Sequence, residues 1–203
     1  MFDARVLEAS RDFIEGLAQN LHERGVKADQ VTWAGFAIGL SALPLLALGA
    51  ELLAMIAILT NRIADGVDGA LARKQGPTDT GAFLDIVLDF IFYAAVPLGF
   101  ALQNPEQNAA AAALLLFSFI GTASSFLAFA IFAERRQLKS TEFTRKGFYY
   151  LGGLTEATET IGLFLICSLF PSLFPTLATL FALLCLLTTA MRLRSGMEAL
   201  SHS

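Results

Sequence analysis

The residues best suited to chemistry lie in one stretch, which runs from Asp65 to Asp89 and reads DGVDGALARKQGPTDTGAFLDIVLD. This stretch places the carboxylates of Asp65, Asp68, Asp85 and Asp89 in some of the most apolar sequence of the chain. An unpaired charge in such surroundings costs kilocalories rather than tenths, so the four acids need a reason to be there. Hard divalent cations, Mg²⁺ or Mn²⁺, would satisfy them, and this many carboxylates could bridge two ions roughly 3.5–4 Å apart.

Two helices must position these side chains. In helices, Asp65 and Asp68 share one face because they are three residues apart, and Asp85 and Asp89 share one face because they are four apart. The Gly-Pro pair at 76–77 breaks the chain between them. We therefore expect an antiparallel helical hairpin in which the two carboxylate pairs face each other.

The face of the first helix continues beyond its two acids through Gly69, Ala72 and Arg73. Gly69 and Ala72 leave room for a ligand to approach the backbone, and the guanidinium of Arg73 offers a fork suited to phosphate oxygens. This pattern predicts a combined metal and phosphate site.

The spacing of these residues resembles the motif of the CDP-alcohol phosphotransferase family, D-x2-D-G-x2-A-R-x7–8-G-x3-D-x3-D. Eight positions match in order: Asp65, Asp68, Gly69, Ala72, Arg73, Gly81, Asp85 and Asp89. The resemblance implies that metals held by the first three aspartates clamp the pyrophosphate of a CDP-alcohol. It also implies that Asp89 takes the proton from an acceptor hydroxyl and contacts a metal, and that Gly69, Ala72 and Arg73 bind the CDP-alcohol.

The resemblance adds three further residues of the nucleotide pocket. The family carries a Pro-Asn-x-x-Thr element before its first span, and here Ala28 and Asp29 replace Pro and Asn while Thr32 matches. We therefore expect Thr32 and Asp29 to contact the CDP-alcohol, together with Thr78. A residue at positions 78–80 could alternatively cap the following helix.

The composition indicates an all-α, polytopic integral membrane protein. The chain has 203 residues, of which 55% are hydrophobic and 16% charged, and its mean hydropathy is +0.61. Six apolar segments approach the length needed to span a bilayer, near 31–49, 51–73, 80–102, 109–133, 148–170 and 175–193. Little remains outside the membrane, so residues 1–203 are expected to form a single domain. A soluble helical bundle is disfavoured because residues 109–117 and 161–170 show no polar stripe.

The N-terminal residues 1–24 are expected to form an amphipathic surface helix. Apolar residues at helical spacing, Phe2, Val6, Ala9, Phe13, Leu17 and Leu21, lie opposite acids and bases. Mixed charge argues against a specific attraction to anionic lipid, so packing against the bundle is the favoured role.

The distribution of basic residues predicts the topology. Lys and Arg concentrate near the termini and in the 73–80 and 134–147 loops, whereas the alternate connections at 49–51, 103–108 and 171–175 contain none. By the positive-inside rule, both termini and these two loops are cytoplasmic. Asp65 lies 14 residues beyond Glu51, which is about 21 Å along a helix, so the acids fall in the cytoplasmic leaflet.

Several polar residues lie outside the motif. Arg62 is either a second phosphate contact or a neutralising partner of Asp65, and the second role is favoured. Arg145 and Lys146 either belong to a solvated loop or attract a phosphorylated acceptor. Glu156 and Glu159 fall in the fifth predicted span, where they would contact an acceptor, complete the metal shell or pair with Arg62.

These features favour an enzyme of the inner membrane of a bacterium, with its active site on the cytoplasmic side. We expect it to transfer the phosphatidyl group of a CDP-alcohol, CDP-diacylglycerol above all, to a small hydroxyl-bearing acceptor, releasing CMP. The resemblance implies a homodimer, and no nucleic-acid partner is expected. The alternative is a divalent-cation or proton transporter, which is disfavoured because the far ends of spans two and three are almost wholly apolar. A purely structural or inactive protein is disfavoured because all four acids and Arg73 are present.

Overall fold

The computed structural model describes residues 2–136 and 154–201, with side chains from residue 11 onward. Its helices are α1 (Phe2–Glu23), α2 (Ala28–Leu40), α3 (Ala42–Ala47), α4 (Glu51–Gln75), α5 (Asp79–Gln103), α6 (Pro105–Arg135), α8 (Ala157–Leu169) and α9 (Phe174–Ser201). A short 3-10 turn, η1 (Pro171–Leu173), precedes α9. The described residues contain no strand, which confirms the all-α prediction.

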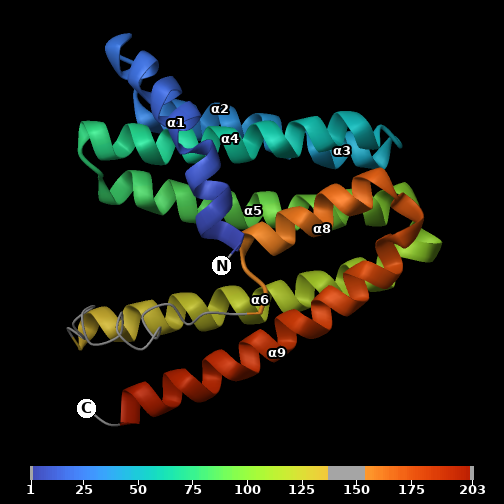
Figure 1. Cartoon of the computed structure of the whole chain (residues 1–203). Coiled ribbons are helices and arrows are strands. Elements are labelled where there is room, and N and C mark those ends of the chain that lie inside the picture. Colours follow the sequence, from blue (N-terminus) through green and yellow to red (C-terminus); the bar gives the residue numbers. More distant parts are fainter. Residues whose placement is uncertain (1, 137–153, 202–203) are drawn as a thin grey trace.

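The long helices lie side by side and connect at alternate ends of the bundle (Figure 1). The α2–α3 pair packs against both α4 and α5, and α5 packs against α6, which pairs with α9. Helix α8 lies against α4 and α9, while α1 crosses the outside of α4 at an angle (Figure 1). This order leaves the α4–α5 hairpin next to α2.

A core of apolar side chains fills the half of the bundle that is distant from the α4–α5 turn. Its largest fully buried members are Phe92, Phe100, Phe164, Phe174, Leu46, Ile58 and Leu115. The rings of Phe100 and Phe174 stack with centroids 4.4 Å apart, which connects α5 to the start of α9. Many other large apolar side chains are exposed, as expected for helices that face lipid.

Two glycines bring α2 unusually close to α4. A Cβ atom at Gly35 would lie 2.5 Å from the Cβ of Ala64, and one at Gly39 would lie 2.7 Å from the side chain of Asn61. Both glycines are therefore required for close packing within the chain, as their four-residue spacing indicates.

The predicted hairpin is present. Helix α4 ends at Gln75, and Gly76 adopts a φ of 91°, a left-handed conformation that glycine reaches without steric cost. Thr78 then begins α5 as its N-cap, since its hydroxyl accepts a hydrogen bond from the Gly81 amide at 3.0 Å. Gln75 also fastens this end of α4 to the start of α2: its amide donates to the Val26 carbonyl at 2.6 Å and accepts from the Ala28 amide at 3.1 Å.

Four stretches are long and apolar enough to cross a membrane: Ala28–Ala47, Asp79–Gln103, Pro105–Arg135 and Pro171–Ser201. Helix α4 has 25 residues, which is also sufficient length, but it carries Arg62, Asp65 and Asp68 in its middle. The integral membrane fold is confirmed, whereas the count of six spans stays a prediction.

The fifth predicted span, 148–170, differs from the structure. In the described part of that range only α8, with 13 residues, is helical. The helix begins after Glu156 because the amide of Glu156 donates to the side chain of Glu159 at 3.0 Å, which is the arrangement of a helix N-terminus. The two glutamates are therefore at the end of a helix rather than inside one.

Helix α1 packs against α4, as favoured, with a face that overlaps only part of the predicted stripe. Leu21 of the stripe packs together with Ile14 and Ala18 in a cluster that includes Val67 and Leu71. Phe13 belongs to the predicted stripe and remains 61% exposed. The packed face is therefore centred on Ala18, which is fully buried, and not on Phe13.

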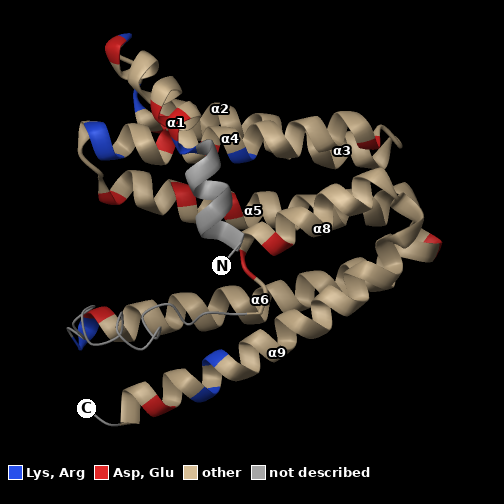
Figure 2. Cartoon of the chain, in the orientation of Figure 1, with Lys and Arg blue, Asp and Glu red and all other residues tan. Residues whose placement is uncertain are grey.

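Most of the Lys and Arg among the described residues lie toward the end of the bundle that holds the α4–α5 turn and the C-terminus (Figure 2). Arg62, in the middle of α4, is an exception. Glu51 and Glu106, in the first turns of α4 and α6, lie at the opposite end. This separation matches the asymmetry from which the topology was predicted.

Candidate active site

A pocket opens between α2, α4 and α5 in the half of the bundle that contains the α4–α5 turn. Its lining combines polar and apolar side chains: Thr32, Gly35, Phe36, Asn61, Arg62, Asp65, Asp68, Asp85, Leu88 and Asp89. All four predicted carboxylates therefore share one cavity. The motif spacing places them there because the hairpin turns each pair toward the other helix.

Three of the four carboxylates form a compact cluster. Asp65, Asp68 and Asp85 each place a carboxylate oxygen so that the three oxygens lie within 4.8 Å of one another. Asp68 is buried, with 6% of its surface exposed, while Asp85 opens to the outside. Converging carboxylate oxygens, one of them buried, are the donors that a hard divalent cation requires, so the residues present fit Mg²⁺ or Mn²⁺.

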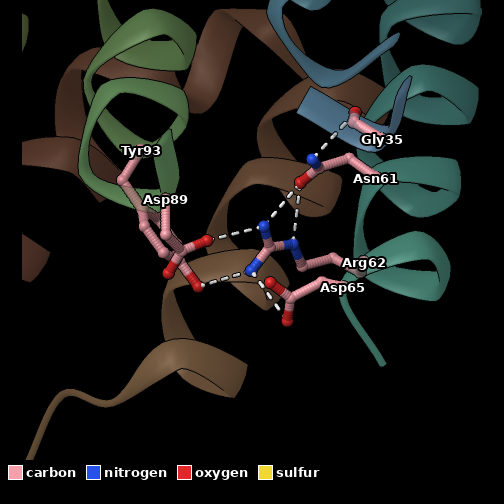
Figure 3. Close-up of polar contacts among 6 residues, drawn as sticks. All are labelled: Gly35, Asn61, Arg62, Asp65, Asp89 and Tyr93. Carbon is pink, nitrogen blue, oxygen red and sulfur yellow. Dashed lines mark hydrogen bonds and ion pairs between the residues drawn. The ribbon is translucent and has the colours of Figure 1, made fainter. Parts of the chain in front are cut away.

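The fourth carboxylate has a different neighbour (Figure 3). Asp89 places Oδ1 2.7 Å from Nη2 of Arg62, whereas Arg62 reaches Oδ2 of Asp65 only at 3.8 Å from Nη1. The prediction that Arg62 neutralises an acid is confirmed for Asp65. The shorter contact, with Asp89, was missed because it joins two helices.

Two further residues hold this arginine and were not predicted from the sequence. The Oδ1 atom of Asn61 accepts from Nε and Nη2 of Arg62, and its Nδ2 donates to the Gly35 carbonyl on α2 at 3.0 Å (Figure 3). The hydroxyl of Tyr93 accepts from Nη1 at 3.3 Å. The sequence feature that could have indicated the contact with Asn61 is the pair Asn61–Arg62, an amide next to an arginine within an apolar segment.

The residues expected to bind the nucleotide lie around the start of α5. Thr32 lines the pocket, and its hydroxyl donates to the Ala28 carbonyl at 3.1 Å. A Cβ atom at Gly81 would lie 3.2 Å from Oγ1 of Thr78 and 3.3 Å from Oδ1 of Asp29. The absent side chain of Gly81 thus lets these two residues approach from α2 and from the turn.

The rest of the α4 stripe extends from the pocket toward the turn. A Cβ atom at Gly69 would lie 3.6 Å from Nη1 of Arg73, so Arg73 folds back over the glycine. Arg73 and Lys74 both pair with Glu15 of α1, at 3.6 Å and 3.4 Å. Arg73 is exposed and Ala72 is half-buried, and neither is among the residues that line the pocket.

The predicted acceptor-side residues fall into two groups. Arg145 and Lys146 lie outside the described residues. Glu156 and Glu159 lie at the N-terminus of α8, where Glu159 caps the helix. Among the described contacts, the partners of Arg62 are Asn61, Asp65, Asp89 and Tyr93, so pairing of Arg62 with either glutamate is not observed. The roles of these residues toward an acceptor stay predictions.

The sequence of the chain is similar to a known protein family and to individual relatives. The model of the family described as CDP-alcohol phosphatidyltransferase matches residues 26–191. The chain is 52% identical over 196 residues to the inner membrane protein YnjF of Escherichia coli, covering 97% of this chain and 95% of the relative. It is also 34% identical over 90 residues to an archaetidylinositol phosphate synthase of Pyrococcus horikoshii, covering 44% of this chain and 48% of that protein.

Solved structures share the fold. The phosphatidylinositol phosphate synthase of Mycobacterium tuberculosis with CDP-DAG bound superposes with a TM-score of 0.73 at 23% identity, covering 91% of this chain and 93% of that chain. The same synthase in complex with manganese and citrate gives a TM-score of 0.68 at 22% identity, covering 90% and 88%.

Proposed function

The chain belongs to the CDP-alcohol phosphatidyltransferase family, and we propose that it transfers the phosphatidyl group of CDP-diacylglycerol to the hydroxyl of a small alcohol, releasing CMP. The observation that carries the proposal is the single pocket that holds all four motif carboxylates. The related synthase that was solved with CDP-DAG supports the choice of donor.

We propose that Asp65, Asp68 and Asp85 hold the divalent cations, Mg²⁺ or Mn²⁺, of which the pocket is expected to take two. When bound, such cations withdraw charge from a phosphoryl group and stabilise a departing phosphate. The three oxygens within 4.8 Å of one another support this assignment, as does the manganese complex of the related synthase. Asp68 would supply the buried ligand from α4, and Asp85 would supply the exposed ligand from α5.

The residues near the α4–α5 turn are proposed to bind the CDP part of the donor. The close approach that Gly81 allows brings Asp29 and Thr78 to one edge, and Thr32 adds a hydroxyl inside the pocket. Gly69 and Ala72 present a shallow surface on α4, beside which Arg73 offers its guanidinium to phosphate oxygens.

Asp89 is proposed to be the general base. The acceptor hydroxyl would give its proton to Asp89, its oxygen would form a bond to the phosphorus that carries the diacylglycerol, and the bond from that phosphorus to CMP would break. One carboxylate oxygen of Asp89 is occupied by Arg62, which leaves the other to receive the proton. Asp89 lines the pocket, so it is accessible to an acceptor that enters there.

The placement of the pocket suits a lipid donor and a water-soluble acceptor. The site lies in the half of the bundle that carries most Lys and Arg, which we propose to be the cytoplasmic half, with both termini on that side. Helix α5, which contributes Asp85, Leu88 and Asp89 to the pocket, also carries exposed apolar residues, including Phe83, Val87 and Phe90. We propose that the diacylglycerol tails lie along such surfaces in a bacterial inner membrane, as the inner membrane relative suggests.

The packing on the far side of the pocket disfavours transport. Ile58, Phe92, Val96 and Phe100 are buried in the core between the carboxylates and the opposite end of the bundle. An ion path would need polar groups or water along this route. These apolar side chains offer no polar route from the carboxylates through this part of the described bundle.

The direct test is CMP release by the purified protein with CDP-diacylglycerol, Mg²⁺ or Mn²⁺ and a panel of alcohols. The panel would include glycerol phosphate, inositol, inositol phosphate, serine and choline. We expect one acceptor class to release CMP with formation of the matching phospholipid. Absence of CMP with every alcohol and both cations, from protein that binds the donor, would reject the proposal.

A further inference from the structure

The first turn of α2 takes a hydrogen-bond acceptor from another helix. Its N-cap is Lys27, whose side chain has no acceptor atom and so cannot cap the amides that follow. The amide of Ala28 instead donates to Oε1 of Gln75, the last residue of α4, at 3.1 Å. Nε2 of the same side chain donates to the Val26 carbonyl at 2.6 Å. Gln75 therefore holds the backbone on both sides of Lys27.

The backbone that Gln75 holds leads directly into residues proposed to bind the nucleotide. Asp29 follows Ala28 in the sequence, and the hydroxyl of Thr32 donates to the Ala28 carbonyl at 3.1 Å. A Cβ atom at Gly81 would lie 3.3 Å from Oδ1 of Asp29, so the start of α2 lies against the start of α5. The position of Asp29 and Thr32 relative to α5 therefore depends on where the first turn of α2 is held.

The place of this contact distinguishes it from a tie that only holds two helices together. Helices α2 and α4 are already joined farther along by the close packing at Gly35 and Gly39. Gln75 instead joins their ends, three residues before Thr78, the N-cap of α5. Its amide both donates and accepts, so it fixes the direction of the first turn of α2 as well as its distance from α4.

The residue at position 28 explains why the first turn needs this support. The resembling family has proline here, which has no N–H group and holds its own φ at about −65°. Ala28 has an N–H group that needs an acceptor and a backbone with more freedom. Lys27, with φ −86° and ψ 148°, has the extended conformation that a residue before proline adopts. Gln75 thus supplies from α4 a constraint that proline would supply locally.

From these contacts we propose that Gln75 is a positioning residue for donor binding. It fixes the first turn of α2 against the α4–α5 turn and so keeps Asp29 and Thr32 at the edge of the nucleotide site. Gln75 is not among the residues that line the pocket, so it acts through the residues that it holds. The inference rests on the proposed function for its effect on the donor, but not for its effect on the backbone of α2.

Steady-state turnover with CDP-diacylglycerol tests the effect on the donor. Gln75→Ala should raise KM for the donor about threefold to tenfold, as expected for the loss of one or two hydrogen bonds, and leave kcat within about twofold. Gln103→Ala is the matched control, because Gln103 donates to Glu51 and joins the opposite ends of the same hairpin. It should leave KM unchanged. An unchanged KM in Gln75→Ala, or an equal rise in Gln103→Ala, would overturn the inference.

Ala28→Pro tests the hydrogen bond separately from the glutamine. It removes the N–H group that Gln75 accepts and places proline at the first position of a helix, where it is tolerated, so KM should stay within about threefold of wild type. In this background Gln75→Ala should raise KM by less than about twofold, because one of its two bonds is already absent. The full rise seen in the wild-type background would contradict the proposed role.

Hydrogen exchange followed by mass spectrometry, in detergent without substrate, gives a readout that does not depend on turnover. Gln75→Ala should speed exchange of the amides in residues 26–32 by about threefold or more and leave exchange in α6 as in wild type. Unchanged exchange in residues 26–32 would show that Gln75 does not hold this turn.

Gln75→Leu keeps the length of the side chain without its polar atoms, so it provides the same tests, with the same expected results, if the alanine variant aggregates. If the proposed function is wrong, wild type itself releases no CMP, while hydrogen exchange still decides whether Gln75 fixes the start of α2.

Discussion

Asp89 and Arg62 are joined across the α4–α5 hairpin by a contact of 2.7 Å, the shortest ion pair among the described residues. The partner of the acid is thus an arginine on the neighbouring helix rather than the aspartates of the same pocket. This ion pair distinguishes Asp89 from Asp65, Asp68 and Asp85, whose carboxylate oxygens converge in the same pocket.

The first prediction concerns Asp89 itself. Asp89→Asn removes the proton acceptor but keeps the size and a hydrogen-bond acceptor for Arg62, so turnover should fall at least 100-fold, a loss of about 2.7 kcal/mol or more in transition-state stabilisation. Donor binding, measured as the thermal shift on adding CDP-diacylglycerol, should persist. Asp79→Asn, an exposed acid at the start of the same helix, is the control. Normal turnover in Asp89→Asn would exclude this residue as the base.

Metal removal is the second prediction. Chelation with EDTA should abolish CMP release, and either Mg²⁺ or Mn²⁺ should restore it, because the cluster consists only of oxygen ligands. Asp68→Asn should weaken Mn²⁺ binding by at least about tenfold, since it removes the buried member of the cluster. The comparison is again Asp79→Asn, which should bind as wild type does. Activity that survives exhaustive chelation would contradict a metal-dependent reaction.

Gly81 provides the third prediction. A Cβ atom at this position would meet Oγ1 of Thr78 at 3.2 Å and Oδ1 of Asp29 at 3.3 Å, so both side chains would have to move. We expect Gly81→Ala to raise KM for the CDP-alcohol several-fold with a smaller effect on kcat. Gly162→Ala in α8 adds the same methyl group where nothing lies within 4 Å and should match wild type. An unchanged KM in Gly81→Ala would remove this edge from the nucleotide site.

The fourth prediction concerns the contact between α2 and α4. Gly39→Ala would place a methyl group 2.7 Å from the side chain of Asn61, so we expect a destabilisation of about 1–3 kcal/mol and a lower melting temperature in detergent. Gly16→Ala in α1 meets nothing within 4 Å and serves as the control. Because Asn61 fixes Arg62, the Gly39 variant should also lose turnover. A melting temperature equal to wild type would show that α2 can move away from α4 at no cost.

Orientation in the membrane is the fifth prediction. The two native cysteines, Cys167 and Cys185, are buried, so single cysteines introduced at exposed positions can be labelled selectively. In intact cells with a permeable outer membrane, an impermeant maleimide should label Glu106→Cys and spare Arg194→Cys until the inner membrane is broken. Both positions are exposed, at opposite ends of the bundle. The reverse pattern would place the pocket outside the cytoplasm.

The features of this molecule that could be predicted from the sequence are those that depend on short, regular spacing of residues. The three- and four-residue intervals of the aspartates, and the Gly-Pro break between them, were sufficient to predict the hairpin and the shared pocket. These features depend on helix periodicity, which is local.

Contacts between segments that are distant in the sequence could not be predicted from residue spacing. The bond between Arg62 and Asp89, and the anchor from Asn61 to Gly35, depend on how three helices are rotated relative to one another. The N-terminus of α8 was misplaced because apolar composition alone does not reveal where the backbone of Glu156 leaves the helix. For α1, the periodicity identified Leu21 but not Ile14 or Ala18, which also pack against α4.

The hairpin described above keeps Arg62 and every motif acid on one unbroken piece of chain. Helices α6, α8 and α9 contribute none of its four acids. The geometry of the pocket therefore depends on the two helices of a single hairpin and on α2 beside them.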